Sequence, residues 1–320
     1  MSTSYERPHL ALHRFIGPEP GPALIILGAV HGNETCGTQA IHSVLDDFAA
    51  RRLRLARGRL TLIPITNPLA YERGTREGER NLNRWLRPVA QPQAFEDHIA
   101  NQLCPELAAH DVLLDLHSFH TAGAPFAMLG PDDNAGPLEP FRHAAAERMF
   151  AARLGVRRFV DGWLDTYARG TARRAGPEDA AYGMGTTEYM RSCGGYGITL
   201  ECGRHDDARA PQVARQAILN ALAHLGLIAA EAPPAVVDPE CLRIVDVIDK
   251  HHDDDDFERP WASFDPLAEG EQIGRRHDGT PVAAPHDGYI VFPNPAATAG
   301  REWFYLARRI APPPGLTAPV

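Results

Sequence analysis

The chain has 320 residues, of which 44% are hydrophobic, and a formal net charge of −9. This length suggests two domains or one large domain, and the apolar content is sufficient to bury a sizeable core. The longest unbroken apolar run, residues 23–30, is far shorter than the roughly 20 residues that a membrane-spanning helix requires. The sequence therefore predicts a globular protein with no membrane partner.

The charged residues restrict the partners further. No basic stripe interleaved with aromatic residues occurs, so a small molecule is a better candidate partner than a nucleic acid. Lys250 is the only lysine, and no glycine-rich phosphate loop precedes it, which excludes Walker-type nucleotide chemistry. A homo-oligomer is compatible with these features.

Two features bear on cellular location. Residues 1–15 lack the basic-then-apolar layout of a secretory signal. The five cysteines are widely scattered and form no CxxC pair, as expected for reduced thiols rather than for a disulfide framework. We therefore expect a cytoplasmic protein.

Most of the chain alternates short apolar runs with segments of helical periodicity. The predicted strands are 23–30, 60–65, 112–116, 156–160 and 197–200, and the predicted helices are 34–52, 95–109, 138–154 and 211–228. Strands that are apolar on both faces and separated by helices indicate an α/β domain with a mostly parallel central sheet flanked by helices.

The composition changes at residues 230–239, where adjacent prolines predict a linker. We therefore divide the chain into a catalytic domain, 1–232, and a small C-terminal all-β domain, 233–320. The latter has predicted strands at 242–248, 280–284 and 289–292, and Asp-Gly pairs at 278–279 and 287–288 favour hairpin turns. The tract 251–256 has the composition of a metal site, but charge blocks of this kind favour a solvated loop.

His31 and Glu34 follow the first predicted strand, three residues apart. This spacing lets both side chains face one point at a loop-to-helix junction, which suits one nitrogen and one carboxylate ligand of zinc. An HxxE pair occurs about once by chance in a chain of this composition. Its position strengthens the hypothesis, because open α/β sheets bind ligands at the carboxyl ends of their strands.

Two further strand ends carry polar residues. Asp115 and His117 lie on one face of the predicted strand 112–116 and its extension, so that His117 would complete a His–Glu–His set and Asp115 would orient an imidazole. A single histidine of this kind is more often a hydrogen-bonded core or surface residue. Glu201 ends the apolar strand 197–200, where a carboxylate is costly without a partner or a function. It is therefore the candidate general base.

The segment from Asn67 to Arg84 is rich in arginine and too charged for a regular element. Loops over a sheet edge often carry binding residues. Its arginines would clamp a substrate carboxylate or stabilise an oxyanion. The alternative is a solvated basic loop.

Together these blocks resemble the succinylglutamate desuccinylase/aspartoacylase family, a branch of the zinc carboxypeptidase-like hydrolases, over most of the chain. The resemblance implies one zinc ion per chain. It assigns as zinc ligands the HGNE residues His31 and Glu34 and the DLH residue His117. It also assigns Glu201 as the catalytic glutamate.

The same resemblance assigns roles in the arginine-rich segment. The family's Asn-Pro…Arg…Leu-Asn-Arg pattern begins at Asn67 and implies that Arg76 stabilises the oxyanion, while Asn83 and Arg84 hold a substrate carboxylate. In aspartoacylase an Asp commonly precedes Leu-Asn-Arg, whereas this chain has Asn81, so the acetyl-aspartate specificity is not transferred.

The resemblance extends to the C-terminal domain, where residues 284–289 are similar to the family's lipoyl-like hairpin and where the domain would cap the site. Aspartoacylase contributes a tyrosine from this domain. Tyr289 is a candidate for it, with a core or hairpin role as the alternative.

These observations predict a zinc-dependent hydrolase that cleaves the amide of a small carboxylate-bearing compound, such as an N-acyl amino acid, with water activated by Glu201. Two alternatives stay open. The same residues would serve a metallocarboxypeptidase that trims peptides, and they would also be present in a non-catalytic zinc- or carboxylate-binding protein.

Overall fold

A computed structural model describes residues 8–173 and 180–316. Among these residues the first half of the chain forms β1 (His13–Ile16), β2 (Glu19–Leu27), α1 (Cys36–Ala49), β3 (Arg57–Ile63), α2 (Pro68–Arg73), α3 (Phe95–Ala108), β4 (Val112–Phe119), β5 (Phe126–Met128) and α4 (Ala144–Ala151). The following part forms β6 (Arg158–Asp161), α5 (Trp163–Arg173), the short 3₁₀ helix η1 (Ala180–Gly183), α6 (Thr186–Ser192), β7 (Tyr196–Arg204) and α7 (Ala210–His224).

The C-terminal part contains only strands among its described residues. They are β8 (Glu240–Asp249), β9 (Asp256–Phe257), β10 (Pro266–Leu267), β11 (Gln272–Arg275), β12 (Pro281–Ala283), β13 (Gly288–Val291) and β14 (Glu302–Arg309). The eight-residue strand β14 was not predicted from the sequence.

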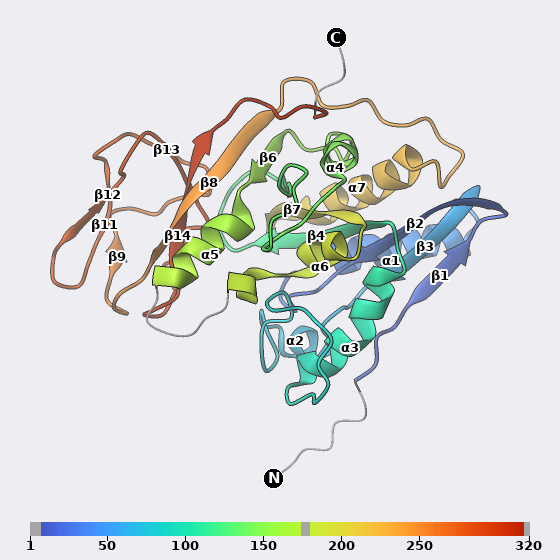
Figure 1. The fold of residues 1–320 in the computed structure, drawn as a ribbon, viewed down its shortest axis with the longest axis horizontal. Helices are drawn as coiled ribbons and strands as arrows, with labels where there is room; N and C mark the ends of the chain where they lie inside the picture. The colour runs from blue at the N-terminus through green and yellow to red at the C-terminus, as the bar shows by residue number, and fades with distance from the viewer. Residues whose placement is uncertain (1–7, 174–179, 317–320) are drawn as a thin grey trace.

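One large mixed sheet organises the molecule (Figure 1). Its strand order is β1-β3-β2-β4-β7-β5-β6-β8-β14-β13-β10, and β12-β11-β9 form a separate small sheet. Strands β3, β2, β4 and β7 run parallel, as do β5, β6 and β8, but β5 is antiparallel to β7. The expectation of a mostly parallel sheet therefore holds in part: within the described part of residues 1–232 only the pairs β1–β3 and β7–β5 are antiparallel, whereas the C-terminal strands β8, β14, β13 and β10 pair with one another in antiparallel fashion.

A short connection reverses the chain between these blocks. Only residues 120–125 separate β4 from β5, whereas a parallel neighbour requires a crossover of a dozen residues or more. The chain turns back after β4, and β5 pairs with the far side of β7 in the opposite direction.

Helices cover both faces of the parallel block. Apolar residues of α1, α4 and α7 pack on one face, and those of α3 and α6 pack on the other. The strands between them are almost fully buried, and all eight residues of β4 are buried. Polar side chains on such a strand must therefore be paired or bind a ligand.

The C-terminal strands continue the large sheet across the predicted boundary at residue 233, because β8 pairs with β6 in parallel. The turn at Asp278-Gly279 does join the hairpin β11–β12. The second expected hairpin, at Asp287-Gly288, is wrong, because β12 and β13 belong to different sheets.

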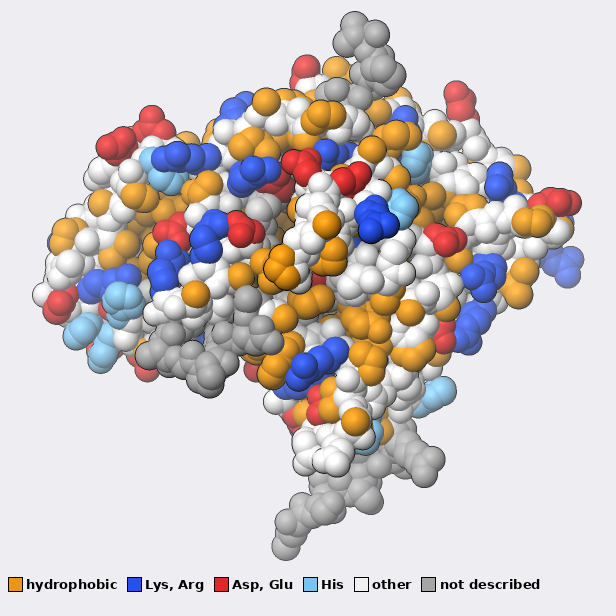
Figure 2. All heavy atoms as spheres, in the orientation of Figure 1, with side chains coloured by type: hydrophobic (Ala, Val, Ile, Leu, Met, Phe, Trp, Pro, Cys, Tyr) orange, Lys and Arg blue, Asp and Glu red, His pale blue; other side chains and the backbone are white. Residues whose placement is uncertain are grey.

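Within the described ranges, no helix combines the length and apolarity that a membrane crossing demands. On the face of the molecule shown in Figure 2, acidic and basic side chains are intermixed.

Candidate metal centre and substrate loop

The loop between β2 and α1 carries the HGNE residues into the interior. Gly32 lies so close to α2 that a Cβ at this position would stand 2.0 Å from the carbonyl carbon of Ala70. Backbone hydrogen bonds from Thr66 to Gly28 and from Asn67 to Ala29 attach the loop to the segment after β3. The loop is therefore held at the carboxyl end of the parallel strands, as the sequence predicts.

The central strands supply the other side chains. Asp115 and His117 share one face of β4, and Glu201 of β7 lies opposite His117 in the parallel register. The three side chains are buried. Residues separated by more than 80 positions in the sequence thus meet at one end of the sheet.

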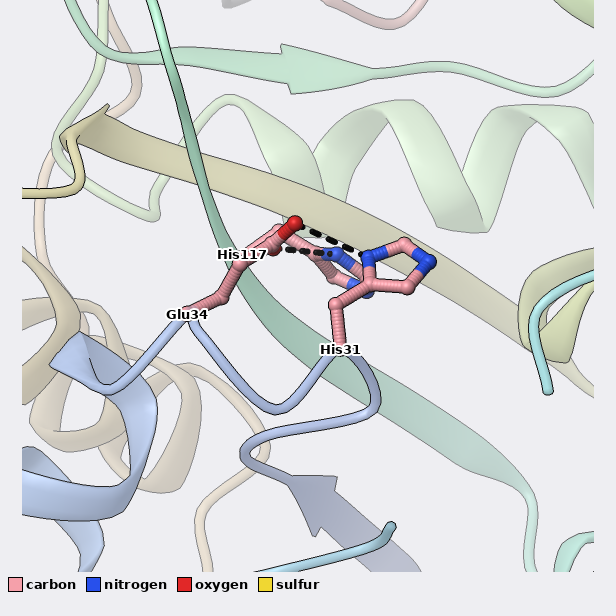
Figure 3. Close-up of side chains that lie close together, drawn as sticks. All are labelled: His31, Glu34 and His117. Carbon is pink, nitrogen blue, oxygen red and sulfur yellow. Dashed lines mark hydrogen bonds and ion pairs between the residues drawn. The ribbon is translucent and has the colours of Figure 1, made fainter. Parts of the chain in front are cut away.

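His31, Glu34 and His117 converge on one point (Figure 3). Nδ1 of His31 lies 2.9 Å from Oε1 of Glu34, and Nδ1 of His117 lies 2.9 Å from Oε2. Nε2 of His117 lies 3.0 Å from Oδ2 of Asp115, and the backbone N–H of Ser118 donates to Glu34. The potential ligand atoms all lie within 4.8 Å of one another.

Burial and charge set the protonation states of this cluster. Burial, assisted by the Arg76 guanidinium, lowers the pKa of His31 to about 4. Burial opposes ionisation of Glu34, but the two imidazoles outweigh it and hold the pKa of this carboxyl well below its usual range. The pKa of His117 is raised well above its usual value, because Asp115 and Glu34 outweigh the effect of burial.

These residues fit a divalent metal. Nδ1 of His31 is buried and makes no hydrogen bond, although it faces a carboxylate oxygen at 2.9 Å. Two electron-rich atoms at this distance are favourable only with a proton or a metal cation between them. Two imidazole nitrogens and one carboxylate form a donor set typical of catalytic zinc.

Glu201 has the environment expected of a proton carrier. Its Oε2 atom is buried without a hydrogen-bond partner. Burial, with the nearby charge of Glu34, raises the pKa of Glu201 to about 8. Groups with perturbed pKa values beside a ligand site are candidates for acid–base catalysis.

Arg76 reaches the same centre from the arginine-rich segment. Its Nη1 donates to Oε1 of Glu34 at 3.0 Å, while about half of the side chain is exposed. The structure thus places Arg76 beside the candidate ligands, at the solvent side of the cluster.

A buried carboxylate that the sequence reading missed holds this segment in place. Glu96, in the first turn of α3, is fully buried and accepts hydrogen bonds from the backbone N–H groups of Gly78, Glu79 and Arg80. It also accepts one from Nδ2 of Asn67, whose Oδ1 caps α2. Both polar atoms of the Asn67 side chain therefore serve the fold, and its predicted contact with substrate stays a prediction.

Arg84 lies between α5 and the C-terminal strands. Its Cζ is 5.0 Å from the ring centroid of Tyr167, and Nη1 donates to the carbonyl of Asn83. Burial opposes its charge, but Tyr167, Tyr305 and Glu302 outweigh that effect and raise the pKa of Arg84 above its usual range. Residues of α5 and β14 therefore border the predicted carboxylate clamp.

Asn83 connects Arg84, the predicted carboxylate clamp, to the group formed by His31, Glu34 and His117. Its Oδ1 accepts the backbone N–H of Thr186 at the start of α6, and the Thr186 hydroxyl donates to Asp115, which faces His117. Thr186 carries no sequence signal, because a threonine at a helix start is common.

A histidine outside the candidate ligand set borders the site. Nδ1 of His205 lies 2.8 Å from Oγ of Ser118, the residue after His117. The charges of Glu34 and Arg76 both act on His205, and burial lowers its pKa. His205 lies five residues after the predicted strand 197–200 and belongs to no recognisable motif, so the sequence did not indicate its position beside the site.

The other candidates lie elsewhere. Tyr289 accepts a hydrogen bond from Arg309 on the neighbouring strand β14. Within the tract 251–256, Asp255 is buried and accepts the backbone N–H groups of His251 and His277. Among the described residues, His31, Glu34 and His117 form the one group with metal-site geometry.

A family model matches most of the chain, whereas the curated proteins give no match. Residues 20–225 match the model of the succinylglutamate desuccinylase/aspartoacylase catalytic domain.

Solved structures share the fold. A succinylglutamate desuccinylase/aspartoacylase from Rhodobacter sphaeroides is 20% identical with a TM-score of 0.71, and the alignment covers 94% of this chain and 90% of that one. The product-bound ectoine utilization protein EutE (DoeB) from Ruegeria pomeroyi is 22% identical with a TM-score of 0.70, covering 93% and 88%. Succinylglutamate desuccinylase from Vibrio parahaemolyticus is 20% identical with a TM-score of 0.67, covering 95% and 92%.

The family model spans well over half of the chain, and its range includes every residue of the metal cluster as well as Glu201 and the segment from Asn67 to Arg84. The chain therefore belongs to the succinylglutamate desuccinylase/aspartoacylase family of hydrolases.

Proposed function

We propose that this protein is a zinc-dependent hydrolase of the amide bond in a small carboxylate-bearing compound, with N-acyl amino acids as the substrate class. The observation that supports it most is the buried His31–Glu34–His117 cluster next to the unpartnered carboxyl of Glu201. A purely structural ion cluster does not require an additional unpaired carboxyl beside it.

His31, Glu34 and His117 would hold the metal. When bound, zinc with three protein ligands supplies a Lewis acid and lowers the pKa of water to around 7. Glu201 accepts the proton of the attacking water at its free Oε2 and returns a proton to the leaving amine. Arg76 donates to the carbonyl oxygen as negative charge develops there.

Arg84 and Asn83 fix the substrate by its carboxylate. A guanidinium can bind a carboxylate through two parallel hydrogen bonds, which sets orientation as well as affinity. Tyr305 of β14 contributes to raising the pKa of Arg84, so it lies close to this guanidinium. This proximity supports a C-terminal region that borders the clamp.

Contacts after β4 support the same position for this region. The hydroxyl of Thr121 lies 2.6 Å from that of Ser263, and Nε2 of His120 lies 3.0 Å from the carbonyl oxygen of Pro293. A region packed on the loop after the His117 strand favours small substrates over peptides.

The test combines metal analysis with substrate profiling. Purified protein reconstituted with zinc should contain about one zinc per chain and should hydrolyse members of a panel of acetyl-, succinyl- and formyl-amino acids faster than short peptides. Faster release of C-terminal residues from peptides would favour the metallocarboxypeptidase alternative. Zinc binding without hydrolysis of any compound would favour a non-catalytic binding protein.

A further inference from the structure

Asn81 occupies a position between the metal cluster and the substrate loop. Its Oδ1 lies 3.1 Å from Nε2 of His31 and accepts the backbone N–H of Asn83 at 2.9 Å. A backbone N–H can only donate, so the side-chain atom that faces both groups must be the amide oxygen.

This assignment fixes the tautomer of His31. Because Oδ1 only accepts, Nε2 of His31 must carry the hydrogen, and in the neutral ring Nδ1 then keeps its lone pair. Nδ1 is the atom that faces Glu34 at 2.9 Å without a hydrogen bond. Asn81 therefore presents the correct nitrogen to a metal.

The two candidate imidazole ligands have different supports. His117 turns its Nε2 toward the carboxylate of Asp115 at 3.0 Å, whereas His31 turns its Nε2 toward a neutral amide. A carboxylate behind a ligating imidazole makes the ring a stronger donor, while an amide orients the ring without adding charge.

The same oxygen also anchors the predicted carboxylate clamp. The Asn83 backbone that it binds immediately precedes Arg84, and the Asn83 side chain continues to Thr186. Loss of the Asn81 amide would release both the His31 ring and the start of the Arg84 segment.

We propose that Asn81 is a positioning residue that couples metal affinity to binding of the substrate carboxylate. Because its amide is neutral, His31 binds the metal less tightly than it would with a carboxylate at position 81. The inference rests on the proposed function.

The experiment measures zinc affinity directly, by competition with a chromophoric chelator on metal-free protein, alongside KM and kcat of the zinc-loaded enzyme. We expect Asn81→Ala to lower zinc affinity about 10- to 100-fold and to raise KM for an acyl amino acid at saturating zinc. Asn81→Asp, which keeps an acceptor and adds charge, should bind zinc more tightly than the wild type.

Asn101 offers a matched control. Asn101 lies in α3, and its amide accepts the backbone N–H of Val89 through Oδ1 and donates to the Val89 carbonyl through Nδ2, in the loop after Arg84. Asn101→Ala removes a comparable pair of hydrogen bonds away from His31 and should leave zinc affinity unchanged.

Three results would overturn the inference: wild-type zinc affinity in Asn81→Ala, equal losses in Asn81→Ala and Asn101→Ala, or zinc binding by Asn81→Asp no tighter than that of the wild type. The third decides the matter even if Asn81→Ala fails to fold. Failure of the wild type to bind zinc would overturn the proposed function as well. Zinc binding without hydrolysis would overturn the function and with it the coupling to substrate, while the zinc affinities of the variants would still decide whether Asn81 positions His31.

Discussion

Replacing Glu96 by glutamine tests how the substrate loop is held. Oε1 of Glu96 accepts hydrogen bonds from Asn67 Nδ2 and from the backbone of Gly78 and Glu79, and Oε2 accepts from Glu79 and Arg80. A glutamine keeps one acceptor oxygen and places an NH₂ group at the other site. The least costly orientation leaves the Arg80 N–H facing a second donor.

The cost follows from these contacts. One buried unsatisfied N–H costs about 1–3 kcal/mol, and the remaining bonds lose the extra strength of a charged acceptor, so we expect Glu96→Gln to lower the free energy of unfolding by about 2–5 kcal/mol. Because the released residues lie between Arg76 and Arg84, KM should rise as well.

Urea unfolding and steady-state kinetics measure both effects. Glu77→Gln is the matched control, since Glu77 lies in the same loop with an exposed side chain and should change stability by no more than about 0.5 kcal/mol. If Glu96→Gln unfolds at the wild-type urea concentration with an unchanged KM, the role assigned to this carboxylate is incorrect.

Four further variants test the site and the C-terminal region. Glu201→Gln should lower kcat roughly 10²- to 10⁴-fold while zinc content is retained; near-normal kcat would remove Glu201 from the mechanism. Arg84→Ala should chiefly raise KM and Arg76→Ala chiefly lower kcat, and identical kinetic effects would contradict the separate roles. Burial opposes ionisation of Asp255, but Arg276 and backbone N–H groups hold its pKa well below the usual range, so this carboxylate stabilises the fold above about pH 4 and the contribution fades as pH falls. Asp255→Asn should therefore cost about 2–4 kcal/mol at pH 7 and less at pH 3, and a cost independent of pH in urea unfolding would contradict this.

The sequence predicts the convergence of His31, Glu34 and His117 because its signals are local. Each ligand follows or ends an apolar strand, and parallel strands bring their carboxyl ends to one edge of a sheet. The strand of His117 extends to Phe119, three residues beyond the predicted end, so that the ligand lies within the strand and not after it. Whether or not the strand includes His117, side chains two residues apart point to the same face, so His117 and Asp115 lie together.

Elements without a continuous apolar signal were missed. The buried face of α5 includes Leu164, Tyr167, Gly170 and Thr171, which recur at helical spacing, but glycine and threonine hide the pattern from a hydrophobicity reading. The apolar run within β14 spans only residues 303–307 and is too short to distinguish strand from helix.

The supports of the site were missed for a different reason. Glu96 resembles an ordinary acidic residue in the first turn of a helix, which the helix dipole alone would explain. Its role depends on a loop that begins 18 residues earlier in the chain, at Gly78. Thr186 similarly acts on Asp115 across 71 positions. Such contacts follow from the tertiary fold, and no spacing rule encodes them.

Two of the buried polar atoms that lack a hydrogen-bond partner lie where the chemistry is proposed. Buried polar atoms are almost always hydrogen-bonded, yet Nδ1 of His31 and Oε2 of Glu201 are not. Each unpartnered buried atom lowers the free energy of unfolding by about 1–3 kcal/mol. Real proteins keep such unfavourable groups mainly at functional sites. One of these atoms faces the position of a metal and the other is the acceptor for a proton. At this site, the two atoms that weaken the metal-free fold are therefore those that the proposed hydrolysis would use.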